Sequence, residues 1–133
     1  MVQKNDIGYF SAEMGIYPRT LYIVKGNDKY KVISENFLSR EYEELEIEKR
    51  DDSDGSCMWS VVERNTDKFG YLVKLNRVES KGDIAHEATH VAFETFRDIG
   101  GLADEDNQEP FAYLVGWITN RLFEALNYKE HKK

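Results

Sequence analysis

The chain has 133 residues, the length of one ordinary domain, and the sequence predicts a single domain over 1–133. Hydrophobic residues make up 41% and charged residues 32%, a balance that argues against disorder, and the longest strongly apolar stretch, 111–118, is too short to span a bilayer. The net charge of −7 argues against nucleic acid as the main partner, because that affinity depends on clustered Lys and Arg. The single cysteine, Cys57, excludes an internal disulfide, and no signal-peptide pattern is found, so we expect a cytoplasmic protein.

The first part of the chain predicts one strand and one short helix. Residues 20–25 are rich in β-branched and aromatic side chains, which is typical of a strand. Residues 28–38 have apolar side chains at helical spacing and predict a short helix, although the alternation of Tyr30 and Val32 also suits a strand. The charged segment 40–54 predicts a solvated irregular connection, or else an acidic segment that binds a partner.

The second part predicts a hairpin followed by two helices. Two strand-like runs, 56–64 and 70–77, are separated by a short polar link and predict an antiparallel β-hairpin. Helical periodicity covers about 82–99 and 107–127, and Gly100-Gly101 between them marks a helix end. The sequence therefore predicts an α+β fold in which a small antiparallel sheet packs against two long C-terminal helices.

The first of these helices carries the pattern His86-Glu87-Ala88-Thr89-His90. Residues four apart project from one helix face, so both imidazoles can reach the same metal ion. Glu87 lies about 100° around the helix from His86, where it can act as a general base on a metal-bound water without being a ligand. The alternative is that the two histidines form a surface pair or hydrogen-bonded structural residues.

Two histidines leave a catalytic zinc one protein ligand short, because such sites usually have three and keep the fourth position for water. Glu109 begins the next helix 19 residues after His90, and from there it would approach the ion from a second direction. Glu94 continues the same helix face and is the alternative, whereas His131 lies in a lysine-rich tail. Glu109 could also close a capping box over 106–109, so its role as a ligand or as a cap stays open.

The first half of the second helix is apolar nearly all round, so we expect it to be covered on more than one face. Glu109 would then be drawn into the interior, where zinc would compensate its charge. Tyr113, one turn later, could hydrogen-bond a ligand or a developing oxyanion, or simply pack. The predicted zinc ligands are therefore His86, His90 and Glu109, and the predicted catalytic residues are Glu87 and Tyr113.

At these residues the sequence resembles the gluzincin metallopeptidases, and its compact arrangement looks like the reduced minigluzincins. The segments GDIAHEATHVAFETF and NQEPFAYLVGWI also resemble small phage- and prophage-type proteins of uncharacterised function, and the resemblance covers about 70–126. It implies a zincin-like fold in which His86, His90 and Glu109 bind zinc and Glu87 activates water for attack on a peptide bond. The chain differs from the family at Tyr113, where gluzincins have an aspartate that supports a histidine.

Related zincins align an extended substrate along an edge strand just before the histidine helix, and 70–77 has the matching position in this chain. We therefore expect a zinc-dependent hydrolase, most simply a peptidase, with a peptide or protein substrate and no nucleic-acid or membrane partner. The competing hypothesis is a non-catalytic phage-type binding protein that keeps the scaffold with or without structural zinc. Glu87 separates the two hypotheses, because only the hydrolase depends on it. Substrate identity and oligomeric state stay open.

Overall fold

The computed structural model describes residues 1–25, 29–45, 56–76, 79–101 and 108–129. Six strands and three helices lie in these ranges, which confirms the predicted α+β class. The strands are β1 (Gln3–Lys4), β2 (Phe10–Glu13), β3 (Thr20–Val24), β4 (Phe37–Ser39), β5 (Cys57–Glu63) and β6 (Phe69–Lys74). The helices are α1 (Lys29–Asn36), α2 (Lys81–Ile99) and α3 (Gln108–Leu126). None of the helices among these residues is long and apolar enough to cross a membrane.

The six strands form one sheet in the order β1-β2-β3-β6-β5-β4. All neighbours are antiparallel except β3 and β6, which run parallel with Thr20 opposite Gly70. The prediction of a small antiparallel sheet is therefore wrong: the sheet is larger and mixed. The parallel pair joins strands that are far apart in sequence, and local patterns do not encode such a long crossover. Gly70 permits the pairing, because a Cβ there would lie 2.1 Å from the carbonyl oxygen of Thr20.

Several predicted elements match the structure. β5 and β6 form the antiparallel hairpin, with Cys57 opposite Lys74, and the predicted strand 20–25 is β3. The short helix predicted over 28–38 is α1, although its last residues belong to β4, which the sequence did not predict. β1 and β2 were not predicted either. Residues 46–55 of the charged connection, like Asp28 and Arg77, lie outside the described residues.

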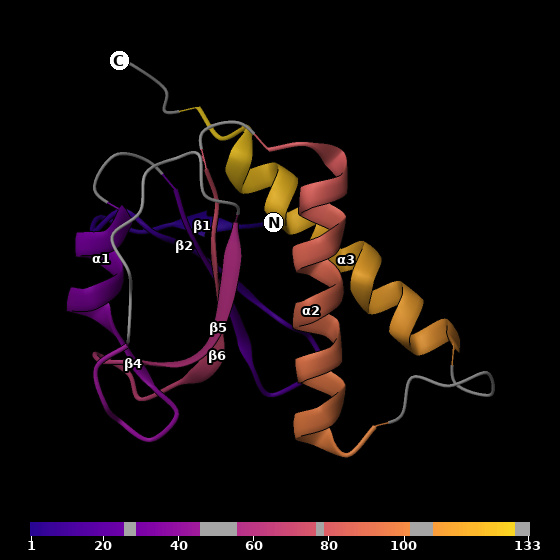
Figure 1. Cartoon of the computed structure of the whole chain (residues 1–133), viewed down its shortest axis with the longest axis horizontal. Coiled ribbons are helices and arrows are strands. Elements are labelled where there is room, and N and C mark those ends of the chain that lie inside the picture. Colours follow the sequence, from indigo (N-terminus) through magenta and orange to yellow (C-terminus); the bar gives the residue numbers. More distant parts are fainter. Residues whose placement is uncertain (26–28, 46–55, 77–78, 102–107, 130–133) are drawn as a thin grey trace.

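The sheet separates two hydrophobic clusters (Figure 1), because successive residues of a strand point to opposite faces. In β3, Leu21 and Ile23 belong to the cluster that packs under α2 and α3. Tyr22 and Val24 belong to the cluster on the opposite face, beneath α1. The molecule therefore has three layers, with α2 and α3 on one face of the sheet and α1 on the other.

α2 has a defined beginning and end. The Ser80 hydroxyl accepts a hydrogen bond from the Asp83 backbone N–H, and the Asp83 carboxylate accepts one from the Ser80 N–H, which together form a capping box. Gly100 ends the helix in the left-handed conformation with φ 75°. α2 and α3 occupy the ranges for which the sequence predicts helices at 82–99 and 107–127. These fixed ends set which side chains of α2 face the sheet and which face solvent.

Candidate functional site

The two motif histidines lie together on the exposed face of α2. The Nε2 atoms of His86 and His90 are 3.1 Å apart, and their rings meet edge to face with centroids 4.5 Å apart. The opposite face of α2 is buried, including Ile84, Ala88 and Val91. The spacing of four residues thus brings two ring nitrogens to one point on the surface. At such a distance the nitrogens either share a proton or face a common cation.

The geometry of this pair fits a metal ion. Zinc binds imidazole nitrogen at about 2.0–2.1 Å, and two ligands of one tetrahedral ion are then about 3.3 Å apart. The observed separation of 3.1 Å is close to that value. Among the residues that the structure describes, no group of three or more His, Cys, Asp or Glu side chains is arranged to hold an ion. The structure therefore brings together two of the three predicted ligands.

Glu87 lies about 100° around α2 from His86, at the border between the exposed histidine face and the buried face, and is only 4% exposed. Burial raises the pKa of its carboxyl group, and the nearby His86 and His90 and a hydrogen bond from Ser56 offset part of that rise. A carboxylate with a raised pKa is a stronger base than a solvated one, and this suits a group that takes a proton from water. The sequence predicts the place of Glu87 on the helix, and the structure adds its burial and its contact with the residue before β5.

Glu109 is exposed on the first turn of α3, so the expectation that it lies in the interior is wrong. The buried side of α3 consists of Leu114, Ile118, Leu122 and Ala125. Glu109 instead lines a surface groove on the outer side of the helix. Residues 106 and 107 of the alternative capping box lie outside the described residues.

Glu94 and Tyr113 are also not grouped with the histidine pair. Glu94 is partly buried on α2, where its carboxylate is 3.7 Å from the guanidinium of Arg97. Tyr113 is 76% exposed and lines the same groove as Glu109, so the structure shows it neither packed in the core nor in contact with Glu87. His131 lies outside the described residues.

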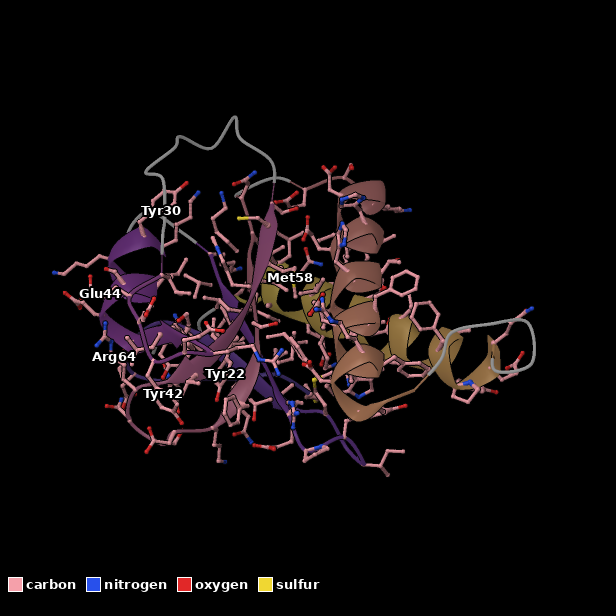
Figure 2. All side chains as sticks on the ribbon, turned by 60° about the horizontal axis from the view of Figure 1, so that its bottom comes forward. Tyr22, Tyr30, Tyr42, Glu44, Met58 and Arg64 are labelled. Carbon is pink, nitrogen blue, oxygen red and sulfur yellow. The ribbon has the colours of Figure 1, made fainter. Side chains whose placement is uncertain are left out.

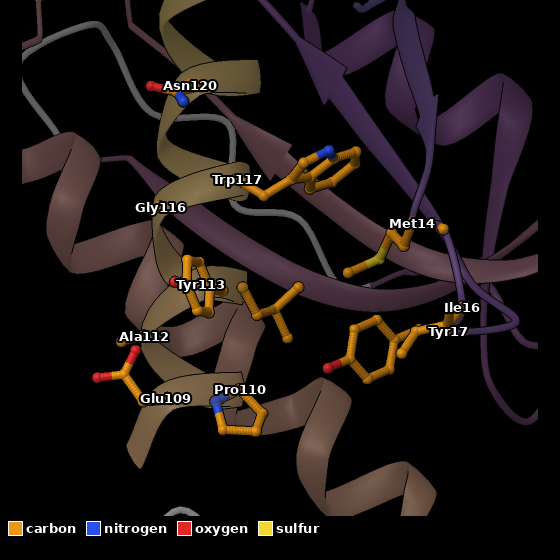
Figure 3. Close-up of a pocket in the computed structure, with 12 residues that line it drawn as sticks. Met14, Ile16, Tyr17, Glu109, Pro110, Ala112, Tyr113, Gly116, Trp117 and Asn120 are labelled. Atoms are coloured by element: carbon orange, nitrogen blue, oxygen red, sulfur yellow. The ribbon is translucent and has the colours of Figure 1, made fainter.

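The groove itself was not predicted. It has a volume of about 840 Å³ and lies between the turn that joins β2 to β3 and the outer side of α3 (Figure 3). Apolar and aromatic side chains form most of its surface, and two of them, Ile16 and Tyr113, are strongly exposed. Its lining residues are Met14, Gly15, Ile16, Tyr17, Glu109, Pro110, Ala112, Tyr113, Leu114, Gly116, Trp117 and Asn120. The all-round apolar character of α3 was its sequence signal, because one apolar side faces the core and the other faces this groove.

The strand predicted to align a substrate is also not an edge strand. β6 pairs with β3 on one side and with β5 on the other, so residues 70–74 of the predicted segment 70–77 have no free edge. β4 pairs with only the last three residues of β5, Val61–Glu63. The first four, Cys57–Ser60, pair with no described strand other than β6. This half of β5 lies beside α2, where Met58 packs into the cluster under the helices (Figure 2). Within the described residues, the strand edge beside α2 that pairs with no second strand is therefore that of Met58–Ser60 in β5.

Comparison of the chain with models of protein families, with curated proteins and with solved structures finds no match. The candidate site is therefore assessed on its own chemistry: an exposed pair of imidazoles and a buried carboxylate between them.

Proposed function

We propose that the chain is a zinc-dependent hydrolase of zincin-like architecture that cleaves peptide bonds. The observation that supports this proposal is the 3.1 Å separation of the His86 and His90 ring nitrogens next to the buried Glu87. The two imidazoles would hold the ion, because their separation fits two positions of a tetrahedral site. One helix would thus supply the two metal ligands and the general base, so few residues outside α2 would be needed for the reaction.

A bound zinc ion supplies Lewis-acid chemistry, which polarises a carbonyl group and makes a water molecule more acidic. Glu87 would accept the proton of the attacking water and deliver it to the leaving amine. Burial raises the pKa of this carboxyl group and makes it a better proton acceptor, and the Ser56 side chain offsets part of the rise. Within the described residues Met58–Ser60 pair with β6 alone, and their outer edge would align an extended substrate by backbone pairing beside α2.

Glu109 stays the proposed third ligand on sequence grounds, and Glu94 stays the alternative. Neither is grouped with the histidines in the structure: Glu94 lies beside Arg97, and Glu109 lines the groove on the far side of α3, so it would have to turn toward α2 to bind the ion. The zinc affinity of single variants distinguishes Glu109 from Glu94 as the third ligand. We expect Glu109→Gln to lower the zinc affinity and Glu94→Gln to leave it unchanged. Glu35→Gln, at an exposed position on α1, is the matched control.

A second candidate function is a binding protein that keeps the scaffold without turnover. Two observations favour it: no three-ligand group is found within the described residues, and a large apolar groove is open on α3. Zinc binding alone does not separate the two functions, because a structural ion would also bind to the histidines. Turnover that depends on Glu87 does separate them.

The test measures zinc and turnover in the same preparations. Protein purified without chelator should contain about one zinc per chain by elemental analysis, and His86→Ala or His90→Ala should remove it. Glu87→Gln should keep the zinc but lower the cleavage of a library of quenched fluorescent peptides by about 100-fold or more. Well under one zinc per chain would overturn the proposal. Full zinc without any Glu87-dependent cleavage would favour the binding protein.

A further inference from the structure

The groove on α3 faces away from the histidine helix. Phe111 packs against Phe93 and Phe96 of α2, with ring centroids 4.7 and 5.4 Å away. Tyr113 follows two residues later, about 200° around the helix, and so projects from the other side. The groove is therefore a second site, separated from His86 and His90 by the body of α3.

Aromatic and aliphatic side chains dominate the groove and leave an unusually apolar surface open. Ile16 is 91% exposed and Tyr113 is 76% exposed, and Figure 3 shows Met14 and Tyr17 facing α3 while Trp117 projects from α3 toward Met14. The volume of about 840 Å³ lies in the range of sites that bind ligands. Large side chains left in water around one concave surface are typical of an interaction site.

Trp117 connects this groove to a second concavity of about 340 Å³ on the N-terminal strands. The second concavity is lined by Met1, Gln3, Ser11, Ala12, Glu13, Trp117 and Arg121. An occupant that follows both concavities is elongated rather than compact. This continuity favours a chain-like ligand over a small rounded one.

Among the described residues, Glu13 at the end of β2 pairs with β3 but not with β1, and it lies in the second concavity. β1 pairs with β2 only at Gln3–Ser11 and Lys4–Phe10, so Glu13 lies beyond the paired part of β1. The Met14 N–H donates to the Arg19 carbonyl on the β3 side, and the Tyr9 carbonyl accepts from Asn5 on the opposite side. Because backbone groups alternate along an antiparallel strand, the N–H and C=O of Glu13 point away from β3, toward the open edge. A peptide backbone is the ligand that such an edge pairs with.

The charge at the larger concavity favours a basic ligand, because Glu109 is the only charged side chain that lines it within the described residues. In the smaller one, Glu13 lies 3.5 Å from the Lys68 ammonium on the surface. Arg121 is already paired with Glu124, and its guanidinium lies 5.2 Å from the Trp117 ring centroid. The whole chain carries a net charge of −7, which disfavours a second copy of the chain as the occupant.

We propose that the groove between the β2–β3 turn and α3 binds an extended peptide whose apolar side chains are flanked by basic residues. The apolar side chains fill the space between Ile16 and Tyr113, and the basic residues lie beside Glu109 and Glu13. The backbone of the peptide pairs with the free edge at Glu13. This site goes beyond the proposed hydrolase and does not depend on zinc.

Calorimetric titration tests the proposal with end-capped synthetic peptides of about six residues, a length that spans about 20 Å when extended. The parent peptide alternates Val and Phe between terminal lysines. We expect saturable binding that weakens about tenfold when the lysines become glutamates. N-methylation of the peptide backbone at alternate residues should weaken it by a similar factor. Equal binding of the acidic peptide, or of the N-methylated one, would overturn the proposed chemistry.

Variants locate the site. Ile16→Ser and Tyr113→Ala should each weaken binding of the parent peptide about tenfold, because each removes apolar surface from the groove. Ile7→Ser, at another exposed apolar position, should leave binding unchanged. Glu109→Gln should reduce the preference for lysine over glutamate, and Glu35→Gln should not. Unchanged affinity in both Ile16→Ser and Tyr113→Ala would refute the site.

Two further measurements separate this proposal from its alternatives. The His86→Ala/His90→Ala variant should bind the parent peptide with the affinity of the unchanged protein. Loss of peptide binding together with zinc would instead show that the two sites are one. Sedimentation that detects a dimer broken by Ile16→Ser, with no peptide binding, would make a second copy the occupant and overturn the proposal.

Discussion

The two faces of the sheet hold different kinds of interior. The face beneath α2 and α3 is built mainly around aliphatic residues such as Ile23, Val73 and Ile118, and its polar groups, Glu87 and the Tyr71–Asp98 hydrogen bond among them, lie where α2 meets the sheet. The face beneath α1 buries polar groups among its aromatic rings. There the Tyr9 hydroxyl donates a hydrogen bond to the Glu63 carboxylate, which also accepts one from Thr66 at 2.6 Å.

This difference shows how the fold separates stability from chemistry. On the helix side the centre of the core is aliphatic, the candidate ligands His86 and His90 lie on the outer surface of α2, and Glu87 is buried at its margin. On the α1 side hydrogen-bonding groups are enclosed, and each needs a partner to offset its burial. We therefore expect substitutions on the two faces to change the free energy of unfolding by different amounts, with different signs and with different pH dependence.

The largest effect is expected in the apolar face. Ile118 is fully buried between α3, α2 and the sheet, and Ile118→Ala removes packed volume that the neighbours cannot refill. We expect a loss of about 3 kcal/mol in the free energy of unfolding, measured by urea denaturation. Tyr113→Ala on the outer side of the same helix should change it by less than about 0.5 kcal/mol. Similar losses in both variants would contradict the assignment of the buried side of α3.

On the polar face, Tyr9→Phe tests the buried hydrogen bond. The substitution keeps the ring and removes a donor to the buried Glu63 carboxylate, so we expect a loss of about 2 kcal/mol. Tyr128→Phe is the control, since its ring packs on Phe10 and the residue is exposed. Equal stability of Tyr9→Phe and the unchanged protein in urea would show that the bond adds nothing.

The beginning of α2 gives a smaller effect on the apolar side. Ser80→Ala removes the acceptor for the Asp83 N–H, and we expect a loss of about 1 kcal/mol in thermal or chemical denaturation. Ser34→Ala on α1, where the hydroxyl donates to the Lys31 carbonyl, serves as the control and should change stability little. A loss of about 3 kcal/mol, as large as that of Ile118→Ala, would mean that Ser80 stabilises the packing of α2 on the sheet and not only its first turn.

The smallest effect should have the opposite sign. The Tyr22 hydroxyl is buried on the polar face (Figure 2) and has no hydrogen-bond partner in the described part of the chain. Tyr22→Phe removes that unsatisfied group, so we expect a gain of about 0.5–1 kcal/mol at neutral pH.

The same variant has a pH signature. Burial, with the nearby Glu63 charge, raises the pKa of Tyr22 from 10.0 to about 12. Above pH 10 the unfolded chain loses this proton before the folded chain does, so the stability of the unchanged protein falls between pH 10 and pH 12. In Tyr22→Phe this fall should be less steep by up to about 1.4 kcal/mol per pH unit. Identical slopes in the two proteins would show that Tyr22 titrates normally.

The elements that could be predicted are those with local patterns. β3 and the β5–β6 hairpin are rich in β-branched and aromatic residues and are bounded by polar turns, and α2 contains a complete helical stripe. β1, β2 and β4 have two to four residues each, too few for a period to emerge. The parallel pairing of β3 with β6 depends on contacts that no local window contains.

The candidate site also has a part that local sequence predicts and a part that depends on distant contacts. His86, Glu87 and His90 belong to one helix, so their spacing predicts their proximity. Glu109 was expected in the interior because α3 is apolar nearly all round. One apolar side instead lines a groove whose opposite wall, the β2–β3 turn, lies about 90 residues away in the chain.

The parallel pair has a consequence for the order in which the molecule assembles. Thr20 pairs with Gly70, 50 positions later, and such a closure is slower than the formation of the neighbouring β5–β6 and α2–α3 hairpins. The N-terminal strands therefore dock late, and they bring the β2–β3 turn with them. Because the groove needs that turn as one wall, we expect its peptide affinity to emerge only in the last kinetic phase of refolding, after the helical signal has recovered.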